Sequence, residues 1–380
     1  MKIERFEMER YQSRYWHEVE YDLSESGVLP MTIRELLGPA SDGEAFVAGT
    51  YLGYPLSEGS LETRTNIAAW YPGANAEHVT VVNGGSEANF LSLWTLLETE
   101  DRLAFMLPNY LQGLGLGRHF GRGTDTFRLR LGSHGWALDL DELKDAVGKR
   151  TKVIMVCNPN NPTGHVLTLD EMDAVVAAAD RVGAWIVADE IYRGAELESD
   201  VTSPTFFGRY DKVIVTSGLS KAFAMPGLRL GWVAASMPEV IRSIWERHDY
   251  TTLTPSMVSD RLAALAMLPD VRQSILTRTR TIIRTNYPAL DAWLHSHDEI
   301  LTWVRPVAGA IAYASYDLPM KSSNLVERIR KERSVLLVPG DMFGLKKGIR
   351  FGFGYDIERT LTALALVDDV LAEVTPAGSR

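Results

Sequence analysis

Residues 151–188 carry the pattern that decides the fold: TKVIMVC at 151–157, NPNNPTG at 158–164, TLDEMDAVVAAADR at 168–181 and AWIVA at 184–188. The first and last of these segments are short apolar runs, which are typical of strands buried on both faces of a sheet. The segment at 168–181 has apolar residues at helical spacing. A strand, a helix and a second strand in this order predict two parallel strands joined by a crossover helix.

The same alternation continues on both sides of this segment. We expect further buried strands at 79–82, 102–106, 212–216 and 228–234, and a helix at 86–97. Strands that alternate with helices predict an α/β fold with a large, mainly parallel sheet covered on both faces. In such sheets, ligands bind beyond the carboxyl ends of the strands. Side chains that directly follow these strands are therefore the candidates for a functional site.

The C-terminal part of the chain has a different pattern, in which strands and helices do not alternate regularly. Helices are expected at 272–295, 323–332 and 360–374, and strands at 310–316, 335–339 and 349–353. This pattern predicts a second, smaller α+β domain. The first forty or so residues have little strand character and are expected to pack against it. We therefore predict a large domain at 46–284 and a small domain formed by 1–45 and 285–380.

Composition and charge exclude several classes of protein. Hydrophobic residues make up 46% of the 380 residues and charged residues 23%, which is the balance of a soluble globular protein. Lysine and arginine number 39 against 49 aspartates and glutamates, so the formal charge is −10. An acidic chain without a basic block gains little affinity from counterion release, which argues against nucleic acid as a partner.

Cysteine and histidine usage bear on the compartment and on metal binding. The single cysteine, Cys157, cannot form an internal disulfide and fits a reducing compartment. The first residues are charged where a signal peptide has an apolar run, and no stretch has the roughly 18 apolar residues that span a bilayer. A cytoplasmic protein without a membrane partner is expected. The eight histidines show no metal-binding spacing, so no metal is expected.

Three motifs at the ends of expected strands carry polar or reactive side chains. Residues 84–87, Gly-Gly-Ser-Glu, form a turn before a helix, where the backbone can approach an anion and the helix N–H groups can bind it. Asp189 follows the strand at 184–188, and Lys221 follows the strand at 212–216 among small residues. A lysine in such a place can lose its proton and act as a nucleophile. Together they supply the phosphate site, the carboxylate and the amine that pyridoxal phosphate requires.

In this order, the motifs resemble those of the fold-type I pyridoxal-phosphate (PLP) enzymes, specifically the class I/II aminotransferases, over about residues 21–354. The resemblance implies that Lys221 forms the Schiff base with the cofactor. It implies that Asp189 pairs with the pyridine nitrogen. Tyr192 and Asn161, the latter in the motif Asn161-Pro162-Thr163-Gly164, are implied to bind the ring oxygen of the cofactor.

The resemblance also implies the remainder of the cofactor site. The residues expected to bind the phosphate are Gly85, Ser86, Glu87, Ser220 and Arg229. Tyr110 is expected to stack on the pyridine ring. Tyr54 is expected to reach the phosphate of a neighbouring subunit, which implies a homodimer with shared active sites. The family usually has a serine three residues before the lysine, whereas here Gly218 stands there and Ser217 precedes it.

The implied substrate is an amino acid whose α-carboxylate pairs with Arg350. The implied reaction passes through an external aldimine and a quinonoid, and Lys221 moves the α-proton to give transamination. A narrower resemblance at 22–28, 249–255 and 335–340 is to the subgroup that contains capreomycidine synthases. That resemblance leaves a second reaction open, in which a hydroxyarginine loses its hydroxyl group and its guanidino group closes a ring.

The substrate is expected to carry a cationic side chain, such as a guanidinium. Glu25 is an acidic residue in a segment that lines the substrate in relatives, together with Gly27, and its carboxylate is suited to a guanidinium. The loop at 249–255 is expected to contribute to reading the side chain. No motif supplies the second arginine that an enzyme for aspartate or glutamate would need.

A non-catalytic protein is a further alternative, because this fold also occurs as the effector-sensing half of transcription regulators. Those proteins carry an N-terminal helix-turn-helix module, and about forty residues precede Ala45 here. A degenerate scaffold is expected to lose Lys221 or Asp189, and both are present. These observations favour an enzyme.

Overall fold

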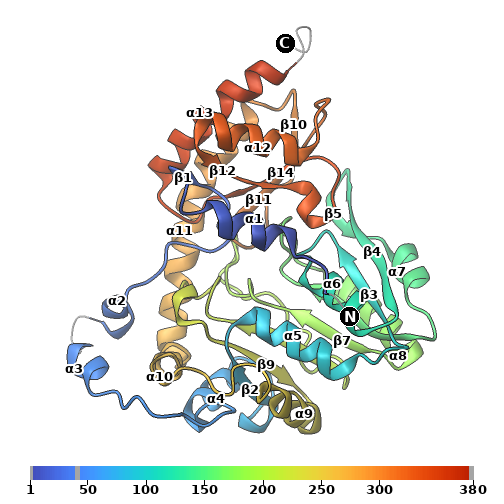
Figure 1. Ribbon diagram of the computed structural model, residues 1–380, viewed down its shortest axis with the longest axis vertical. Coiled ribbons are helices and arrows are strands. Elements are labelled where there is room, and N and C mark those ends of the chain that lie inside the picture. The colour runs from blue at the N-terminus through green and yellow to red at the C-terminus, as the bar shows by residue number, and fades with distance from the viewer. Residues whose placement is uncertain (1–2, 39–42, 376–380) are drawn as a thin grey trace.

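An eight-stranded sheet forms the centre of the larger part of the protein (Figure 1). The structure is a computed structural model, and it describes residues 3–38 and 43–375. Its strand order is β2-β9-β8-β7-β6-β3-β4-β5. The strands are β2 (Val79–Val82), β3 (Arg102–Leu107), β4 (Gly123–Gly132), β5 (Gly135–Leu138), β6 (Thr151–Cys157), β7 (Trp185–Asp189), β8 (Val213–Gly218) and β9 (Gly231–Ala235). Pairing is parallel from β8 through β7, β6 and β3 to β4, while β9 and β5 are antiparallel to their neighbours. The predicted mainly parallel sheet is confirmed.

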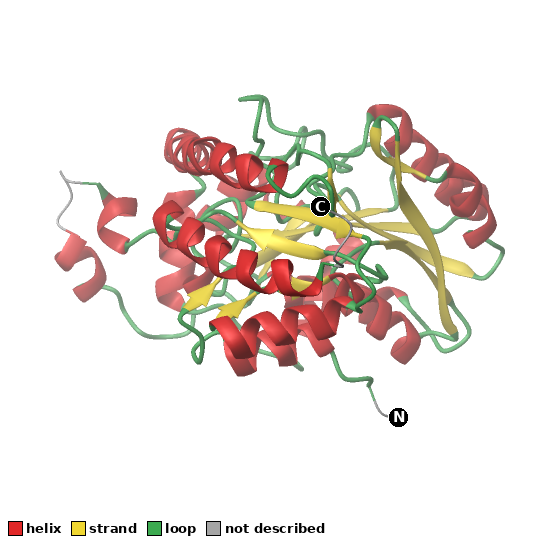
Figure 2. Ribbon diagram, turned by 90° about the horizontal axis from the view of Figure 1, so that it is seen from above, coloured by secondary structure: helices red, strands yellow, loops and turns green. Residues whose placement is uncertain are grey.

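Both faces of this sheet are covered by helices, which explains the unbroken apolar runs of its strands. Successive side chains point to opposite faces, so Ile154 and Val156 of β6 lie in one buried cluster and Val153 and Met155 in another. The first face packs against α4 (Leu61–Ala68), α7 (Leu140–Ala146), α8 (Leu169–Val182) and α10 (Met257–Ala266). The second face packs against α5 (Gly85–Leu96), α6 (Gln112–Phe120) and α9 (Pro238–His248). Figure 2 shows helices on both sides of the strands.

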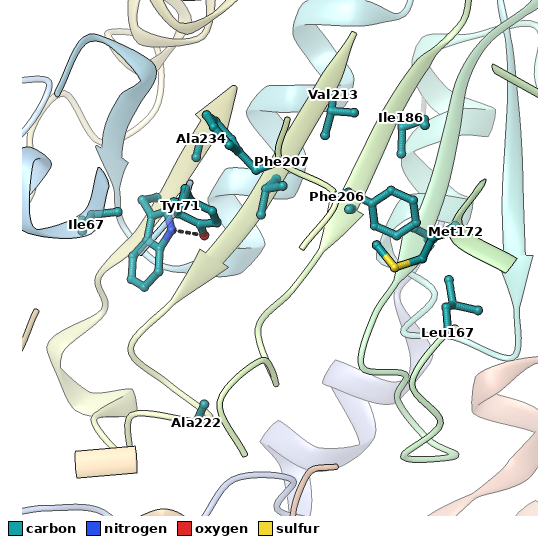
Figure 3. Close-up of a cluster of buried hydrophobic side chains, with 14 of the residues drawn as sticks. Ile67, Tyr71, Leu167, Met172, Ile186, Phe206, Phe207, Val213, Ala222 and Ala234 are labelled. Atoms are coloured by element: carbon teal, nitrogen blue, oxygen red, sulfur yellow. Dashed lines mark hydrogen bonds between the residues drawn. The ribbon is translucent and has the colours of Figure 1, made fainter. Parts of the chain in front are cut away.

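The cluster on the first face contains large aromatic side chains (Figure 3). Phe206 lies beside Met172 of α8, and Tyr71 lies farther along the same face. The indole nitrogen of Trp232 donates a hydrogen bond of 2.8 Å to the hydroxyl of Tyr71. Two polar atoms inside an apolar cluster are therefore paired with each other, as buried polar groups need to be.

The C-terminal part forms a second layer around an antiparallel sheet with the order β10-β11-β14-β13. These strands are β10 (Leu301–Trp303), β11 (Ile311–Tyr316), β13 (Val338–Pro339) and β14 (Ile349–Gly352), and α12 (Ser322–Arg333) and α13 (Ile357–Val374) pack against them. The single strand expected at 335–339 is wrong. Its first half is β12 (Val335–Leu336), which pairs in parallel with β1 (Tyr21–Asp22), whereas β13 pairs with β14. The change of partner splits the strand.

Helix α11 (Pro269–His295) joins the two parts of the molecule. Its first half contributes Ile275 and Leu276 to the cluster on the first face of the large sheet. Its second half contributes Tyr287, Leu290 and Leu294 to the cluster of the C-terminal part. The domain boundaries at 45/46 and 284/285 stay a prediction, and α11 spans the second of them.

The N-terminal elements lie at the junction of the two parts and at one edge of the molecule. Helix α1 (Glu7–Tyr15) lies between the two parts, whereas α2 (Ile33–Leu37) and α3 (Gly43–Ala48) project from the body in both ribbon views (Figures 1 and 2). Short 3₁₀ turns occur at η1 (Ala76–His78), η2 (Pro226–Leu228) and η3 (Gly340–Phe343). No helix within residues 3–38 and 43–375 is both long enough and apolar enough to cross a membrane.

The strand expected at 228–234 begins later, at Gly231. Pro226–Leu228 form η2 instead, and Arg229 follows with a left-handed backbone at φ 47°. A left-handed residue interrupts an extended chain, so Arg229 lies in a turn before β9 and not within the strand.

Candidate active site

A cavity of about 550 Å³ lies at the carboxyl ends of the parallel strands. Three parts of the chain meet there, namely the N-terminal segment, the loops that follow the large sheet, and β14. The predicted site residues that line it are Glu25, Gly85, Ser86, Tyr110, Asn161, Asp189, Tyr192, Ser220, Lys221, Arg229 and Arg350. The structure thus brings together most of the side chains that the sequence motifs predict.

Asp189 is the last residue of β7, and two donors hold its carboxylate. The side-chain amide of Asn89 donates to Oδ2 at 2.9 Å, and the backbone N–H of Ile191 donates to Oδ1 at 3.1 Å. Burial raises the pKa of Asp189, while these two hydrogen bonds act in the opposite direction. The carboxylate therefore has fixed contacts on the protein side and faces the cavity with its remaining acceptor capacity.

Lys221 follows β8 and forms an ion pair with Glu25. Its Nζ lies 2.6 Å from Oε1 of Glu25, which also accepts hydrogen bonds from the backbone N–H groups of Ser26 and Gly27. Burial alone would raise the pKa of Glu25, but the charge of Lys221 and these hydrogen bonds lower it to about 2. The carboxylate is thus ionised at neutral pH. Gly27 does not itself border the cavity, yet a Cβ there would lie 3.5 Å from Cδ of Lys221.

The N-terminus of α5 lies beside Arg229 and is suited to an anion. Gly84 stands at the N-cap with φ 96°, and no side chain caps the helix, so the first N–H groups of this 12-residue helix point toward the cavity end of the sheet. A Cβ on Gly84 would lie 2.6 Å from Nη2 of Arg229. The guanidinium therefore lies directly beside the turn that Gly85 and Ser86 form.

Tyr110 connects the cavity with α1. Its hydroxyl donates to Oε1 of Glu9 at 2.7 Å, and its ring packs edge-on against Phe6 with 4.8 Å between centroids. Helix α1 thereby lies over the cavity, and Met8, Glu9, Gln12 and Trp16 line it. No motif pointed to these four residues, because α1 carries none and is placed by tertiary packing.

Arg350 projects from β14 and is 2% exposed. Its Nη1 donates to Oδ1 of Asn161 at 3.0 Å, and its Nη2 donates to the carbonyl oxygen of Ser24. Its Nε is buried without a hydrogen-bond partner, and no carboxylate among residues 3–38 and 43–375 forms an ion pair with it. A buried guanidinium with an unused donor is suited to a carboxylate ligand.

These features fit pyridoxal phosphate. The uncapped N-terminus of α5 with Arg229 suits the phosphate, and Asp189 suits a protonated ring nitrogen. Lys221 supplies the amine, and Tyr110 supplies an aromatic wall. The unpaired Nε of Arg350 remains for the carboxylate of a substrate.

Some predicted residues lie outside the cavity. Tyr54 is 83% exposed and borders a separate surface hollow with Phe46 and Leu56. The carboxylate of Glu87 accepts from the backbone N–H of Asn83 at 2.6 Å and from the hydroxyl of Thr252 at 2.8 Å, so it faces away from the cavity. For Glu87, only a backbone contact with the phosphate is compatible with this position.

One further expectation needs correction, and the position of Ser217 can be described. The loop at 249–255, all of it described, does not line this chain's cavity. The side-chain amide of Asn83 instead donates to the Thr252 hydroxyl and to the Thr254 carbonyl oxygen. Ser217 lies within β8, and its hydroxyl donates to the backbone carbonyl of Glu190 at 3.3 Å. Because the side chain of Ser217 points into the protein, it does not reach the phosphate site.

Asn89 is a site residue that the motifs did not identify. It borders the cavity, and its position one turn after Ser86 on α5 is a signal that could have found it, because residues three apart share one helix face. Among the described residues, no group of three His, Cys, Asp or Glu side chains is arranged to hold a metal ion.

Known proteins share this architecture and this sequence pattern. A family model for class I and II aminotransferases matches residues 21–365. Capreomycidine synthase from Streptomyces vinaceus is 28% identical over 357 residues, which are 90% of this chain and 88% of the relative. The crystal structure of a PLP-dependent aminotransferase from Streptococcus suis 89-1591 is 29% identical, with a TM-score of 0.91 and full coverage (100%) of both chains.

A PLP-dependent cyclase, OrfR, is 26% identical with a TM-score of 0.86 over 99% of both chains. The predicted fold type I and the predicted resemblance to the subgroup with capreomycidine synthase are confirmed. The family match covers most of the chain, and the cavity holds the side chains that pyridoxal phosphate needs. The protein is therefore a PLP-dependent member of the class I and II aminotransferase family.

Proposed function

We propose that this enzyme transfers the α-amino group of an amino acid with a cationic, guanidino-type side chain. The observation that carries the proposal is the position of Glu25, whose carboxylate lies in the cavity within 2.6 Å of the Lys221 amine. A carboxylate that lines the cavity favours a substrate whose side chain carries a positive charge.

The charges that line the cavity support the same substrate class. Arg350 is left for the α-carboxylate and Arg229 for the phosphate, so the described lining holds no further arginine for a distal carboxylate. Glu9 adds a second carboxylate on the α1 side. An acidic substrate would meet repulsion from both glutamates, whereas a guanidinium can pair with either.

The roles of the chain's own residues follow from their contacts. Pyridoxal phosphate, when bound, supplies an aromatic ring that accepts the electron pair left by loss of the substrate's α-proton. Asp189 holds a proton on the ring nitrogen, and the Lys221 amine moves the proton at the substrate's α-carbon. Arg350 orients the substrate through its carboxylate, and helix α1 with Trp16 shields the cavity from water.

The ion pair with Lys221 explains why Glu25 would require a cation. With pyridoxal phosphate in the site, the Lys221 amine would be engaged by the cofactor, and Glu25 would no longer have the ammonium group that lies 2.6 Å away as its partner. A largely buried carboxylate without a cationic partner is unfavourable. A substrate guanidinium would restore that partner, so substrate binding and the charge of Glu25 support each other.

A second reaction is supported by the relatives. Capreomycidine synthase and the PLP-dependent cyclase OrfR are similar to this chain over most of its length. Elimination of a hydroxyl group followed by ring closure of the guanidino group would use the same cofactor site and the same cationic substrate. The two reactions differ in product: transamination yields an oxo acid, and cyclisation yields an amino acid that keeps its nitrogen.

The test is a panel of amino acids followed by absorbance of the bound cofactor and by product mass. Arginine, hydroxyarginine and ornithine are expected to change the cofactor spectrum more than aspartate or leucine. Glu25→Gln is expected to weaken binding of arginine about 10- to 100-fold, the range of one charged hydrogen bond. A strong preference for aspartate, or an unchanged preference in Glu25→Gln, would refute the cationic substrate.

We further propose a homodimer with shared active sites. Tyr54 is implied by the family resemblance to serve the partner's phosphate, and it is 83% exposed together with Tyr51 at 81% and Leu52 at 81%. Exposed aromatic and aliphatic side chains in one segment favour burial in an interface. The loop at 249–255, which does not line its own chain's cavity, is a second candidate to face a partner. A cytoplasmic location remains part of the proposal.

A further inference from the structure

We propose that Asn89 and Thr216 are positioning residues that hold the Asp189 carboxylate ionised and turned toward the cavity. The inference rests on the proposed role of Asp189 as partner of the cofactor's ring nitrogen. It adds two side chains that act through Asp189 and not on the substrate.

The three side chains meet because of the register of the sheet. Asp189 of β7 lies opposite Thr216 of β8 in a parallel pair. Val187 and Ile214, two residues earlier on the same strands, lie in the cluster that α5 covers. Since side chains two residues apart share a face, Asp189 and Thr216 both point toward α5, which carries Asn89.

A chain of hydrogen bonds runs through these residues in one direction. The Thr216 hydroxyl donates to Oδ1 of Asn89 at 2.6 Å, and Nδ2 of Asn89 donates to Oδ2 of Asp189 at 2.9 Å. Thr216 is 0% and Asn89 2% exposed, so water does not compete for these bonds. With its oxygen occupied by Thr216, the Asn89 amide presents its N–H group to Asp189.

This polarity decides which form of Asp189 is stabilised. If the amide were turned over, its oxygen would face the carboxylate, and two electronegative atoms would repel. An N–H donor stabilises an ionised carboxylate and not a protonated one, whereas burial favours the protonated form. The ring nitrogen and the carboxylate share one proton. Asn89 opposes the effect of burial and thereby leaves that proton on the ring nitrogen.

The proton's position is measurable without turnover, from the ¹⁵N NMR shift of bound pyridoxal phosphate labelled at the ring nitrogen. The wild-type protein is expected to show a protonated nitrogen. Asn89→Leu removes the donor at similar volume. This variant is expected to move the ¹⁵N shift toward the value of an unprotonated ring nitrogen. It is also expected to lower kcat/KM about 10- to 100-fold, the range of one charged hydrogen bond.

A pair of variants at Thr216 tests the orienting bond. Thr216→Val keeps the shape of the side chain but removes the hydroxyl that orients the Asn89 amide. The ¹⁵N shift is therefore expected to change in the same direction as in Asn89→Leu, but by less. Thr216→Ser keeps the hydroxyl and is expected to restore the wild-type shift. Ser92→Ala is the matched control on α5, because the buried Ser92 hydroxyl donates to the Ala88 carbonyl at 2.7 Å within its own helix.

Asp189→Asn separates failure of this inference from failure of the proposed function. If that variant loses the protonated signal while cofactor-bound Asn89→Leu keeps it, the positioning role is overturned and the role of Asp189 stands. A protonated signal and near-native turnover in Asp189→Asn would instead refute the role of Asp189 itself. Should Asn89→Leu not fold, equal shifts in Thr216→Val and Thr216→Ser would overturn the inference.

Discussion

Glu190, next to Asp189, shows how one buried side chain can make stability depend on pH. Its Oε1 accepts from the Thr205 hydroxyl at 2.9 Å and from the Phe206 N–H at 2.7 Å, while its Oε2 is buried without a hydrogen-bond partner. Burial raises the pKa of Glu190 to about 7, although the charge of Arg193 works against this. The folded protein therefore binds this proton more tightly than the unfolded chain does.

The sign of the effect follows from that difference. The bound proton contributes fully to the free energy of unfolding below pH 4.5, which is the ordinary pKa of a glutamate. This contribution is lost as the pH rises through about 7, the pKa of Glu190 in the folded protein. Glu190→Gln keeps an acceptor and removes the charge. We expect it to raise the free energy of unfolding at pH 8 by about 2–3 kcal/mol, and to leave it nearly unchanged at pH 4.5.

Denaturant unfolding at the two pH values measures this difference. Glu246→Gln, an exposed position on α9, is the control and should change stability little at either pH. If Glu190→Gln raised the free energy of unfolding equally at pH 4.5 and pH 8, the result would contradict the titration of Glu190 between these pH values.

At the scale of elements, a buried ion pair fixes α11 against the segment after β7. Nη2 of Arg280 lies 2.6 Å from Oε2 of Glu196, and both side chains are almost fully buried. The other oxygen of Glu196 accepts from the N–H of Gly194 and from both donors of Ser203. Removing the carboxylate would leave the buried guanidinium of Arg280 without its ion-pair partner, and three further hydrogen-bond donors without an acceptor.

We therefore expect Glu196→Ala to lower the free energy of unfolding by about 3–5 kcal/mol. Arg280→Met should lower the free energy of unfolding by less than Glu196→Ala does. In that variant Glu196 keeps its hydrogen bonds with Gly194 and Ser203, and the methionine side chain fills the space of the arginine. A double-mutant cycle by chemical denaturation measures the coupling. If the free energy of unfolding falls in the double variant by the sum of the decreases in the two single variants, Arg280 and Glu196 are not coupled.

The elements also show what the sequence can predict. The expected limits of β6 agree with the structure, because burial on both faces leaves an apolar run with sharp ends. Helix α8 begins after Thr168, whose capping box with Glu171 is a local signal. By contrast, β12 and β13 were expected as one strand, because their separate partners are distant in sequence.

The same distinction holds for the site. Lys221, Asp189 and Arg350 stand in local motifs, and the parallel sheet brings their loops to one edge. Glu9 and Trp16 reach the cavity only because α1 packs between the two parts of the molecule, which no local pattern indicates. The orientation of Ser217 depends on the pairing of β8 with β9, which fixes which side chains face inward.

At the scale of the whole molecule, Tyr54 makes the proposed dimer testable by complementation. Tyr54→Ala should weaken cofactor binding about 10- to 100-fold, the range of one charged hydrogen bond, and Lys221→Ala should abolish activity. If the sites are shared, a mixed dimer of the two variants contains one site with both residues intact. At a cofactor concentration too low to fill the sites of Tyr54→Ala, activity should therefore rise on mixing after subunit exchange.

Sedimentation of each variant checks that the dimer persists, and Tyr54→Phe separates the loss of the hydroxyl from the loss of the ring. No recovery in mixed dimers would show that Tyr54 does not serve the partner. A fully active monomer would contradict the dimer itself.

Helix α11 has a consequence for how the protein opens. Its two halves are anchored in different buried clusters, through Ile275 and Leu276 at one end and Leu290 and Leu294 at the other. The middle of the helix cannot lose its hydrogen bonds unless one cluster comes apart. Its amide protons should therefore exchange with deuterium among the slowest in the chain, and neither part should behave as a separate foldon.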